Sequence, residues 1–191
     1  MNVTTEQLFT DARSHNRFTE VAVTDETLRR LYELMKWGPT TANSCPARIV
    51  FVRSAESKAM LISCMSPGNV EKTRSAPVLA VFGMDMAFYE QLPKLYPATD
   101  ARSWFAGKPD LIAATALRNS SLQGGYFIMA ARALGLDCGP MGGFDAAKVD
   151  AAFFAGTTVK SSFVCALGRG QPQALYPRGP RLAFDEACRL A

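Results

Sequence analysis

The sequence has few of the residues with which proteins bind metal ions or perform acid–base catalysis unaided. Its 191 residues include one histidine, His15, and five cysteines that form no CxxC pair. A metal site needs several such ligands at close spacing, so this pattern gives no support for one. An odd number of scattered cysteines indicates free thiols in a reducing compartment, and we therefore expect a cytoplasmic protein.

Two common cofactor signatures are also missing. There is no phosphate-binding GxxxxGK[ST] loop, and residues 168–170 fail as a dinucleotide fingerprint because Gln173 stands where the third glycine belongs. No Ser/His/Asp set is visible, and a lone loop histidine is more often structural or exposed than catalytic. If the chain is an enzyme, a bound cofactor is expected to carry the difficult step.

Long runs of one kind of residue are absent as well. The net charge is +4 with lysine and arginine scattered, which argues against nucleic-acid binding and leaves a few cations for one anionic ligand. Residues 1–12 are typical of a polar helix rather than a signal peptide. Polar residues at 118–123 interrupt the longest apolar stretch before it reaches the length of a membrane span.

The residues that are present predict one domain, residues 1–191, because 48% hydrophobic residues can supply a core. Thr24 and Ser54 are expected to cap helices, and a capping box at Thr4 and Gln7 opens a short one. Helices are predicted at about 4–12, 25–37, 54–64 and 145–154, and strands at 49–52, 77–82 and 161–167. Because the strands are few and separated by helices, the fold class is α/β or α+β with one central sheet.

The chain is organised around a helix predicted at residues 111–134, about 36 Å long at 1.5 Å per residue. This helix is apolar nearly all round, so we expect it to be buried in the core, at a subunit interface, or both. Gly124 and Gly125 inside it each cost about 1 kcal/mol relative to alanine, which indicates close approach of another backbone or a flat ligand. Gly135 is expected to cap its C-terminus.

Several segments outside this helix are candidates for a site, each with an alternative. Residues 13–18 carry two arginines four apart, which suit either a phosphate cradle or a solvated basic loop. Residues 138–143 form either a ligand-binding loop with little bulk or an ordinary Gly/Pro turn. Residues 69–72 are predicted as a polar turn. The aromatic-rich residues 86–109 are either a lid over a site or a surface-packed insertion.

In chain order, five segments resemble the FMN-dependent nitroreductase family. They are residues 13–17, 39–46, 69–72, 134–145 and 177–181. The resemblance covers nearly the whole chain. It implies a nitroreductase-like fold, a central mostly antiparallel sheet flanked by helices, with the long helix at the interface of a homodimer. It also implies FMN as the cofactor and NAD(P)H as co-substrate.

The same resemblance implies which residues bind FMN. Arg13 and the tail arginines hold the phosphate, while Arg17 and Lys72 lie near the pyrimidine side of the flavin, where a cation favours the reduced anion. The segment with Pro39, Thr40 and Asn43 reaches in from the partner subunit. The glycine-rich loop at 140–143 offers a backbone N–H to flavin N5. The full set is Arg13, Ser14, His15, Arg17, Pro39, Thr40, Asn43 (39–43 from the partner), Asn69, Lys72, Pro140, Met141, Gly142, Gly143, Arg178 and Arg181.

Within the family the chain most closely resembles the malonic semialdehyde reductase branch, which is linked to pyrimidine degradation. The resembling segments are residues 34–39, 46–51, 100–105 and 118–121. Gly142 stands where many relatives carry glutamate, and Cys45 stands where they carry glutamine. These departures concern nicotinamide and substrate preference.

The branch implies reduction of 3-oxopropanoate to 3-hydroxypropanoate by ping-pong hydride transfer through flavin N5. Arg102 is then either a clamp for the substrate carboxylate, with Trp104 and Phe105 covering the flavin face, or a surface arginine stacked on Trp104. Two other functions remain open. One is a broad nitro- or quinone-reducing flavoprotein, and the other is a flavin-binding protein without a substrate of its own.

Overall fold

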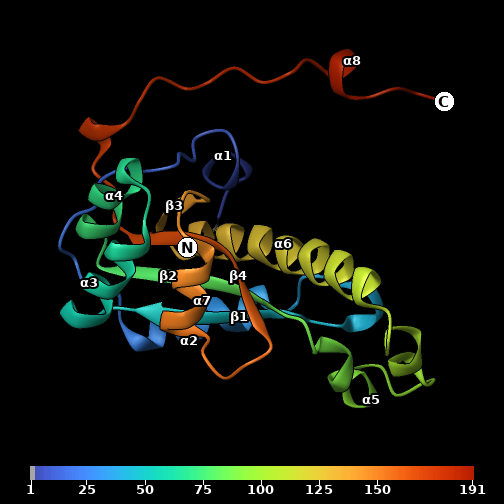
Figure 1. Ribbon diagram of the computed structural model, residues 1–191. Coiled ribbons are helices and arrows are strands. Elements are labelled where there is room, and N and C mark those ends of the chain that lie inside the picture. The colour runs from blue at the N-terminus through green and yellow to red at the C-terminus, as the bar shows by residue number, and fades with distance from the viewer. Residues whose placement is uncertain (1–2) are drawn as a thin grey trace.

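The computed structural model describes residues 3–191 and shows a four-stranded sheet flanked by helices (Figure 1). The strand order is β1-β2-β4-β3, and each neighbouring pair is antiparallel. The strands are β1 (Ala47–Val52), β2 (Val78–Asp85), β3 (Asp137–Met141) and β4 (Val159–Gly168). The prediction of one central antiparallel sheet is confirmed.

β3 lies where the sequence predicted a loop, so that prediction is wrong for residues 138–141. The strand pairs with β4, from Asp137 opposite Gly168 to Met141 opposite Val164. Pro140 lacks an N–H group, which an edge strand tolerates and a central strand does not. Only Gly142 and Gly143 remain of the predicted glycine loop.

Helices cover both faces of the sheet, as side-chain alternation along β2 requires. Val78, Ala80 and Phe82 pack towards α2 (Asp25–Met35) and α6 (Pro109–Ala133). Leu79 and Val81 belong to the core on the opposite face. That core is covered by α3 (Ala55–Cys64) and α7 (Ala146–Phe153), with α4 (Val70–Ser75) beside α3.

The predicted helix starts are confirmed at Thr4, Thr24 and Ser54, whose side chains accept hydrogen bonds from the backbone three residues on. The first helix, α1 (Thr5–Leu8), is shorter than the predicted 4–12. Residues 69–72 are not a polar turn, because α4 begins at Val70. Met1 and Asn2 of the predicted polar N-terminal helix lie outside the described residues. Within residues 3–191, every helix is too short or too polar to cross a bilayer.

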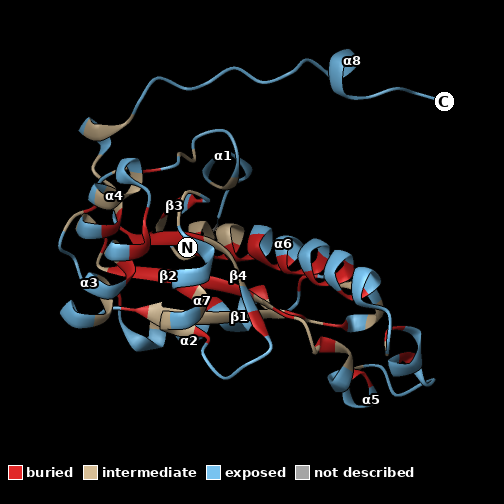
Figure 2. Ribbon diagram, viewed as in Figure 1, coloured by how far each residue is buried: buried red, intermediate tan, exposed pale blue. Residues whose placement is uncertain are grey.

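α6 is the long helix that the sequence predicted, and Gly135 ends it as expected. Gly135 has φ +75°, its N–H bonds to the Arg132 carbonyl at 2.9 Å, and Leu136 N–H bonds to the Ala131 carbonyl at 2.9 Å. One side of the helix packs on the sheet, but the outer side is open (Figure 2). The open side carries the large residues Leu111, Leu117, Leu122 and Tyr126, each 44–51% exposed. The expected burial on nearly all sides is therefore not achieved within one chain.

Residues 86–109 form a small packed layer at the N-terminal end of α6 rather than a loose lid. They contain 3₁₀ turns at Phe88–Gln91 and Ala101–Trp104 and the short α5 (Leu92–Leu95). Phe88, Leu92 and Phe105 are buried together against Ile112 and Ala116 of α6. At the other end of the chain, the tail runs away from the body above α6 and carries α8 (Phe184–Ala187) (Figure 1).

Candidate functional site

A cavity of about 390 Å³ collects arginines from distant parts of the chain. Four guanidinium-bearing residues line it, Arg13, Arg132, Arg178 and Arg181, together with Ser14. None of the described residues lining it is acidic; the others are Phe9, Ala12, Asn16, Tyr176, Pro177 and Gly179. The cavity therefore suits a phosphate, which guanidinium groups bind through paired hydrogen bonds. Arg132 was missed from the sequence, because nothing in a helical arginine marks which distant segment it faces.

Backbone pairing places the N-terminal segment against β3. Ser14 forms a parallel bridge with Cys138, and His15 N–H donates to the Cys138 carbonyl at 2.9 Å. Arginine side chains then tie the tail to this segment: Arg13 donates to the Tyr176 carbonyl, and Arg178 donates to the Thr10 carbonyl at 2.6 Å. The predicted meeting of residues 13–17 with the tail is thus seen within one chain.

His15 is held inside the fold, so its side chain is not placed to bind a ligand. It is 6% exposed, and its Nε2 lies 3.4 Å from Asp137 Oδ1. Asp137 Oδ2 also accepts from Gly170 N–H at 2.8 Å. A Cβ on residue 170 would sit 1.9 Å from His15 Nδ1, so a glycine is required there. That His15 belongs to the FMN site stays a prediction, and this placement of its side chain gives that prediction no support.

Two further predicted cations lie near β3. Lys72, on α4, packs its aliphatic chain over Gly139, where a Cβ would be 3.0 Å from Lys72 Cδ. Partial burial lowers the pKa of Lys72, an effect that the Cys165 thiol partly opposes. Arg17 is half exposed and pairs with Glu71 at 3.3 Å. Lys72 is therefore the one of these two cations that the fold partly desolvates, and an anionic ligand beside it would favour its charged form.

A second hollow, of about 440 Å³, lies between α6 and the end of β3. Its lining is made of small and apolar residues: Ser121, Gly124, Gly125, Ile128, Pro140, Met141, Gly142 and Phe163. Asn69 donates from Nδ2 to the Gly143 carbonyl at 2.9 Å, which fixes the loop at 142–143 next to this hollow. Met141 itself is 4% exposed. A flat ligand could lie against this surface.

The two α6 glycines have different surroundings. A Cβ on Gly124 would lie 2.6 Å from Phe163 Cζ, so Gly124 is needed for packing within the chain. A Cβ on Gly125 would meet no atom within 4 Å, and Gly125 faces the hollow. The close neighbour of Gly124 is thus a side-chain ring rather than the predicted backbone or flat ligand, and for Gly125 close approach stays a prediction.

Pro39, Thr40 and Asn43 line neither the arginine cavity nor the hollow. Their loop is anchored instead to α6 and to the layer at 86–109. Thr41 N–H donates to Asn119 Oδ1 at 2.8 Å, and Asn43 Nδ2 donates to the Leu95 carbonyl at 2.9 Å. Within one chain these residues are thus not brought together with the arginines.

The predicted substrate residues lie in the same layer. Arg102 is engaged by Glu90 through two hydrogen bonds of 2.7 and 2.8 Å, and Trp104 is 44% exposed. Phe105 is 4% exposed and packs edge-on against Phe88. The expected aromatic cover from Phe105 is therefore wrong within this chain, because its ring fills the core of the layer.

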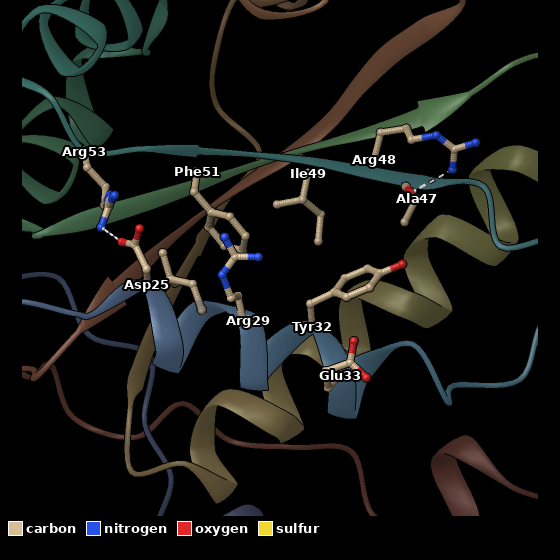
Figure 3. Close-up of a pocket in the computed structure, with 10 residues that line it drawn as sticks. Asp25, Arg29, Tyr32, Glu33, Ala47, Arg48, Ile49, Phe51 and Arg53 are labelled. Carbon is tan, nitrogen blue, oxygen red and sulfur yellow. Dashed lines mark hydrogen bonds and ion pairs between the residues drawn. The ribbon is translucent and has the colours of Figure 1, made fainter.

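A third hollow, of about 960 Å³, contains none of the predicted site residues. It lies between α2 and the free edge of β1 (Figure 3). Tyr32 and Arg29 project from α2 towards Ile49 and Phe51 of β1, and an Arg53–Asp25 ion pair closes one end. Its mixed charges give no preference for an anion.

Comparison with known proteins identifies relatives along almost the whole chain. The model of the "Nitroreductase family" matches residues 10–170. A protein of Polynucleobacter asymbioticus named "Putative NADH dehydrogenase/NAD(P)H nitroreductase" is 58% identical over 185 residues, covering 97% of this chain and 94% of that protein. A protein of Burkholderia lata with the same description is 59% identical over 185 residues, covering 97% and 95%.

Solved structures share the fold at low sequence identity. A "putative nitroreductase in complex with FMN" from Exiguobacterium sibiricum has a TM-score of 0.88 at 19% identity, covering 100% of this chain and 99% of that one. A nitroreductase family protein from Streptococcus pneumoniae has a TM-score of 0.86 at 21% identity, covering 98% and 100%. The nitroreductase-like fold predicted from the sequence is therefore confirmed.

Proposed function

The chain belongs to the nitroreductase family, and from that premise we propose that it is an FMN-dependent oxidoreductase that uses NAD(P)H. The observation that carries this proposal is the arrangement along β3. Ser14 bridges Cys138 beside the arginine cavity, Lys72 lies over Gly139, and Pro140–Gly142 line the hollow. An anion site and a flat, small-residue surface thus lie along one strand, which fits a phosphate joined to a planar ring.

The chain's own residues suit FMN rather than a dinucleotide. Arg13, Arg132, Arg178 and Arg181 would neutralise a terminal phosphate in their cavity. Lys72 would stabilise negative charge on the ring, and Gly142 would let the ring approach the backbone closely. FMN, when bound, supplies the hydride-accepting and hydride-donating chemistry, which explains why the protein needs no acid–base set of its own.

We infer that the enzyme is a homodimer whose partner completes the site. Leu111, Leu122 and Tyr126 are exposed and fall within about 60° of one another around α6, so they form an apolar stripe that a second copy of α6 would cover. Antiparallel packing of two such helices would bring the N-terminal end of one α6 towards the C-terminal end of the other. Pro39, Thr40 and Asn43, held near the N-terminal half of α6, would then reach the partner's flavin.

For the substrate, we propose 3-oxopropanoate, which the enzyme would reduce to 3-hydroxypropanoate. Support comes from the four segments that resemble the malonic semialdehyde reductase branch. A broad nitro- or quinone-reducing activity is the second candidate, and the names of the relatives support it. The third, a flavin-binding protein without a substrate, would show no acceptor-dependent turnover. The five free thiols suit a reducing, cytoplasmic setting.

One set of measurements separates these functions. The purified full chain should be yellow, bleach with NADH or NADPH in the absence of oxygen, and regain colour with an electron acceptor. Turnover is then compared for 3-oxopropanoate, a nitroaromatic compound and a quinone, with parallel reciprocal plots expected for ping-pong kinetics. Failure to bind FMN would reject all three functions, while bleaching without any acceptor turnover would leave only the flavin-binding protein.

A further inference from the structure

The loop between α2 and β1 has an unusual backbone conformation for its sequence. Ala42, Asn43 and Cys45 have φ values of 49°, 51° and 41°, and the loop from Pro39 to Pro46 contains no glycine. Left-handed φ values are unfavourable for residues with a Cβ, although asparagine tolerates them better than alanine or cysteine. Three such residues within four positions persist only if surrounding contacts hold them there.

Two buried amides on α6 supply the first of these contacts. Asn119 Oδ1 accepts from Thr41 N–H at 2.8 Å, and Gln123 Oε1 accepts from Ala47 N–H at 2.9 Å. Their side chains are one helical turn apart and 0% and 4% exposed. Asn119 Nδ2 donates to the Thr115 carbonyl at 2.9 Å, which directs its oxygen towards the loop. The loop is thus bonded to α6 at both of its ends.

Arg48 holds the same loop from the sheet. Its Nη1 donates to the Cys45 carbonyl at 3.0 Å, and its Nη2 pairs with Asp85 Oδ2 at 2.6 Å. Asp85 is itself fixed, because Oδ1 accepts from the Thr158 hydroxyl at 2.6 Å and from Ala87 N–H at 2.9 Å. The left-handed Cys45 is thereby attached to the end of β2.

The conformation at Cys45 is coupled to a side chain that the proposed function assigns to the cofactor. Cys45 N–H donates to Thr40 Oγ1 at 3.1 Å. If the loop relaxed to ordinary φ values, this bond would break and Thr40 and Asn43 would change direction. Anchors that touch no cofactor can therefore control the contacts that the loop makes.

We propose that Asn119, Gln123 and Arg48 are positioning residues for the flavin site, holding residues 40–46 in the strained shape that presents Thr40 and Asn43 to FMN. This inference rests on the proposed function. It explains why α6 buries two amides among apolar side chains. It also predicts that the anchors are needed because the left-handed φ values are unfavourable. A glycine at one of these positions should therefore compensate for a lost anchor.

The test uses full-length protein and follows flavin fluorescence on dilution to obtain the FMN dissociation constant. Asn119→Ala is expected to weaken FMN binding by about tenfold, as for one lost buried hydrogen bond. Adding Ala42→Gly to that variant should recover a large part of the loss, which a purely structural role for Asn119 would not predict. Ser120→Ala is the matched control, because Ser120 is buried on the same helix and its hydroxyl donates to the Leu117 carbonyl of α6 itself.

A second variant and a second readout keep the test decisive. Arg48→Lys retains a charge for Asp85 but cannot bond to both Asp85 and Cys45, so it should also weaken FMN binding. This variant carries the test if Asn119→Ala does not fold. Amide exchange at Thr41 and Ala47 should accelerate in the anchor variants. Unchanged exchange, unchanged FMN affinity, or no recovery with Ala42→Gly would overturn the inference. If the wild-type protein does not bind FMN, the proposed function is rejected, and the positioning role is rejected with it.

Discussion

The guanidinium group of Arg102 is held by Glu90 in a two-point ion pair, with Nε 2.7 Å from Oε2 and Nη2 2.8 Å from Oε1. The hydrogen bonds from Arg102 lower the pKa of Glu90, which favours the charged form of the carboxylate. Both side chains are nearly half exposed. A substrate carboxylate could therefore reach Arg102 only by sharing it with Glu90 or displacing Glu90.

The ion pair between Arg102 and Glu90 adds a second variant to the test of the proposed carboxylate clamp. Arg102→Ala should reduce kcat/KM for 3-oxopropanoate by about 10- to 100-fold, the effect of a lost charged hydrogen bond, and leave an uncharged quinone almost unchanged. Glu90→Gln should lower KM for 3-oxopropanoate, because it frees the guanidinium group. Equal losses with both substrates, or no loss with either, would rule out Arg102 as the clamp.

Arg13→Ala is expected to release FMN during purification. The variant removes one guanidinium group from the arginine cavity and also a hydrogen bond to the Tyr176 carbonyl that holds the tail. Absorbance at the flavin band relative to protein absorbance measures the retained cofactor. Arg53→Ala, at the distant α2–β1 hollow, serves as the control. Full FMN retention by dilute Arg13→Ala would contradict the phosphate assignment.

The glycine pair of α6 should respond asymmetrically to substitution. Gly124→Ala places a Cβ 2.6 Å from Phe163 Cζ, and Phe163 cannot easily move because it stacks on Phe82 at 4.3 Å. Overpacking costs about 1–3 kcal/mol, more than the gain in helix propensity of roughly 1 kcal/mol. Gly125→Ala should instead keep or raise the melting temperature. Equal melting temperatures for the two variants would argue against the packing role of Gly124.

A larger residue at Gly125 tests the hollow itself. Gly125→Leu fills space where no atom of the chain lies within 4 Å of the added Cβ, so the folded chain should tolerate it. If a flavin or a second subunit lies against this surface, the variant should lose dimerisation or FMN. Gel filtration and flavin absorbance decide the matter, and a stable yellow dimer would show that Gly125 has no such role.

Lys72 predicts a pH dependence of FMN affinity. Burial lowers its pKa below the ordinary 10.5, so the folded apoprotein binds fewer protons than the unfolded chain between the two values. Apoprotein stability should therefore rise with pH through that interval. FMN affinity should fall through the same interval, because the anionic cofactor binds the protonated lysine better. Lys72→Met should abolish this fall of FMN affinity with pH. If the affinity of the variant still falls through the same interval, Lys72 is not the source of the pH dependence.

Local signals in the sequence were enough for most of the fold. Caps at Thr24 and Ser54, the apolar run of α6 and the glycine at 135 depend on neighbours within a turn or two, and each was predicted correctly. β3 was missed because Gly139 and Pro140 are poor strand formers by themselves. That strand exists through non-local pairing with β4 and with the segment at Ser14.

Only those site residues that lie in short sequence motifs could be predicted. The arginines at both ends of the chain could be named, but Arg132 could not, since its relevance depends on the path of the tail. Phe105 could be named as a candidate substrate residue, yet its ring fills the layer at the end of α6. The left-handed backbone at Ala42 and Cys45 has no sequence signal, because neither residue favours it.

The several contacts of α6 constrain how this helix can evolve. Successive positions within one turn serve different partners: Leu122 faces outwards, Gln123 bonds to the first residue of β1, Gly124 accommodates Phe163, and Gly125 lines the hollow. A saturation scan of residues 117–128 should therefore show that tolerance to substitution varies with the 3.6-residue period of the helix. Insertions or deletions there should be lethal to function even when they preserve helicity, because a shift of one residue rotates every side chain by about 100°.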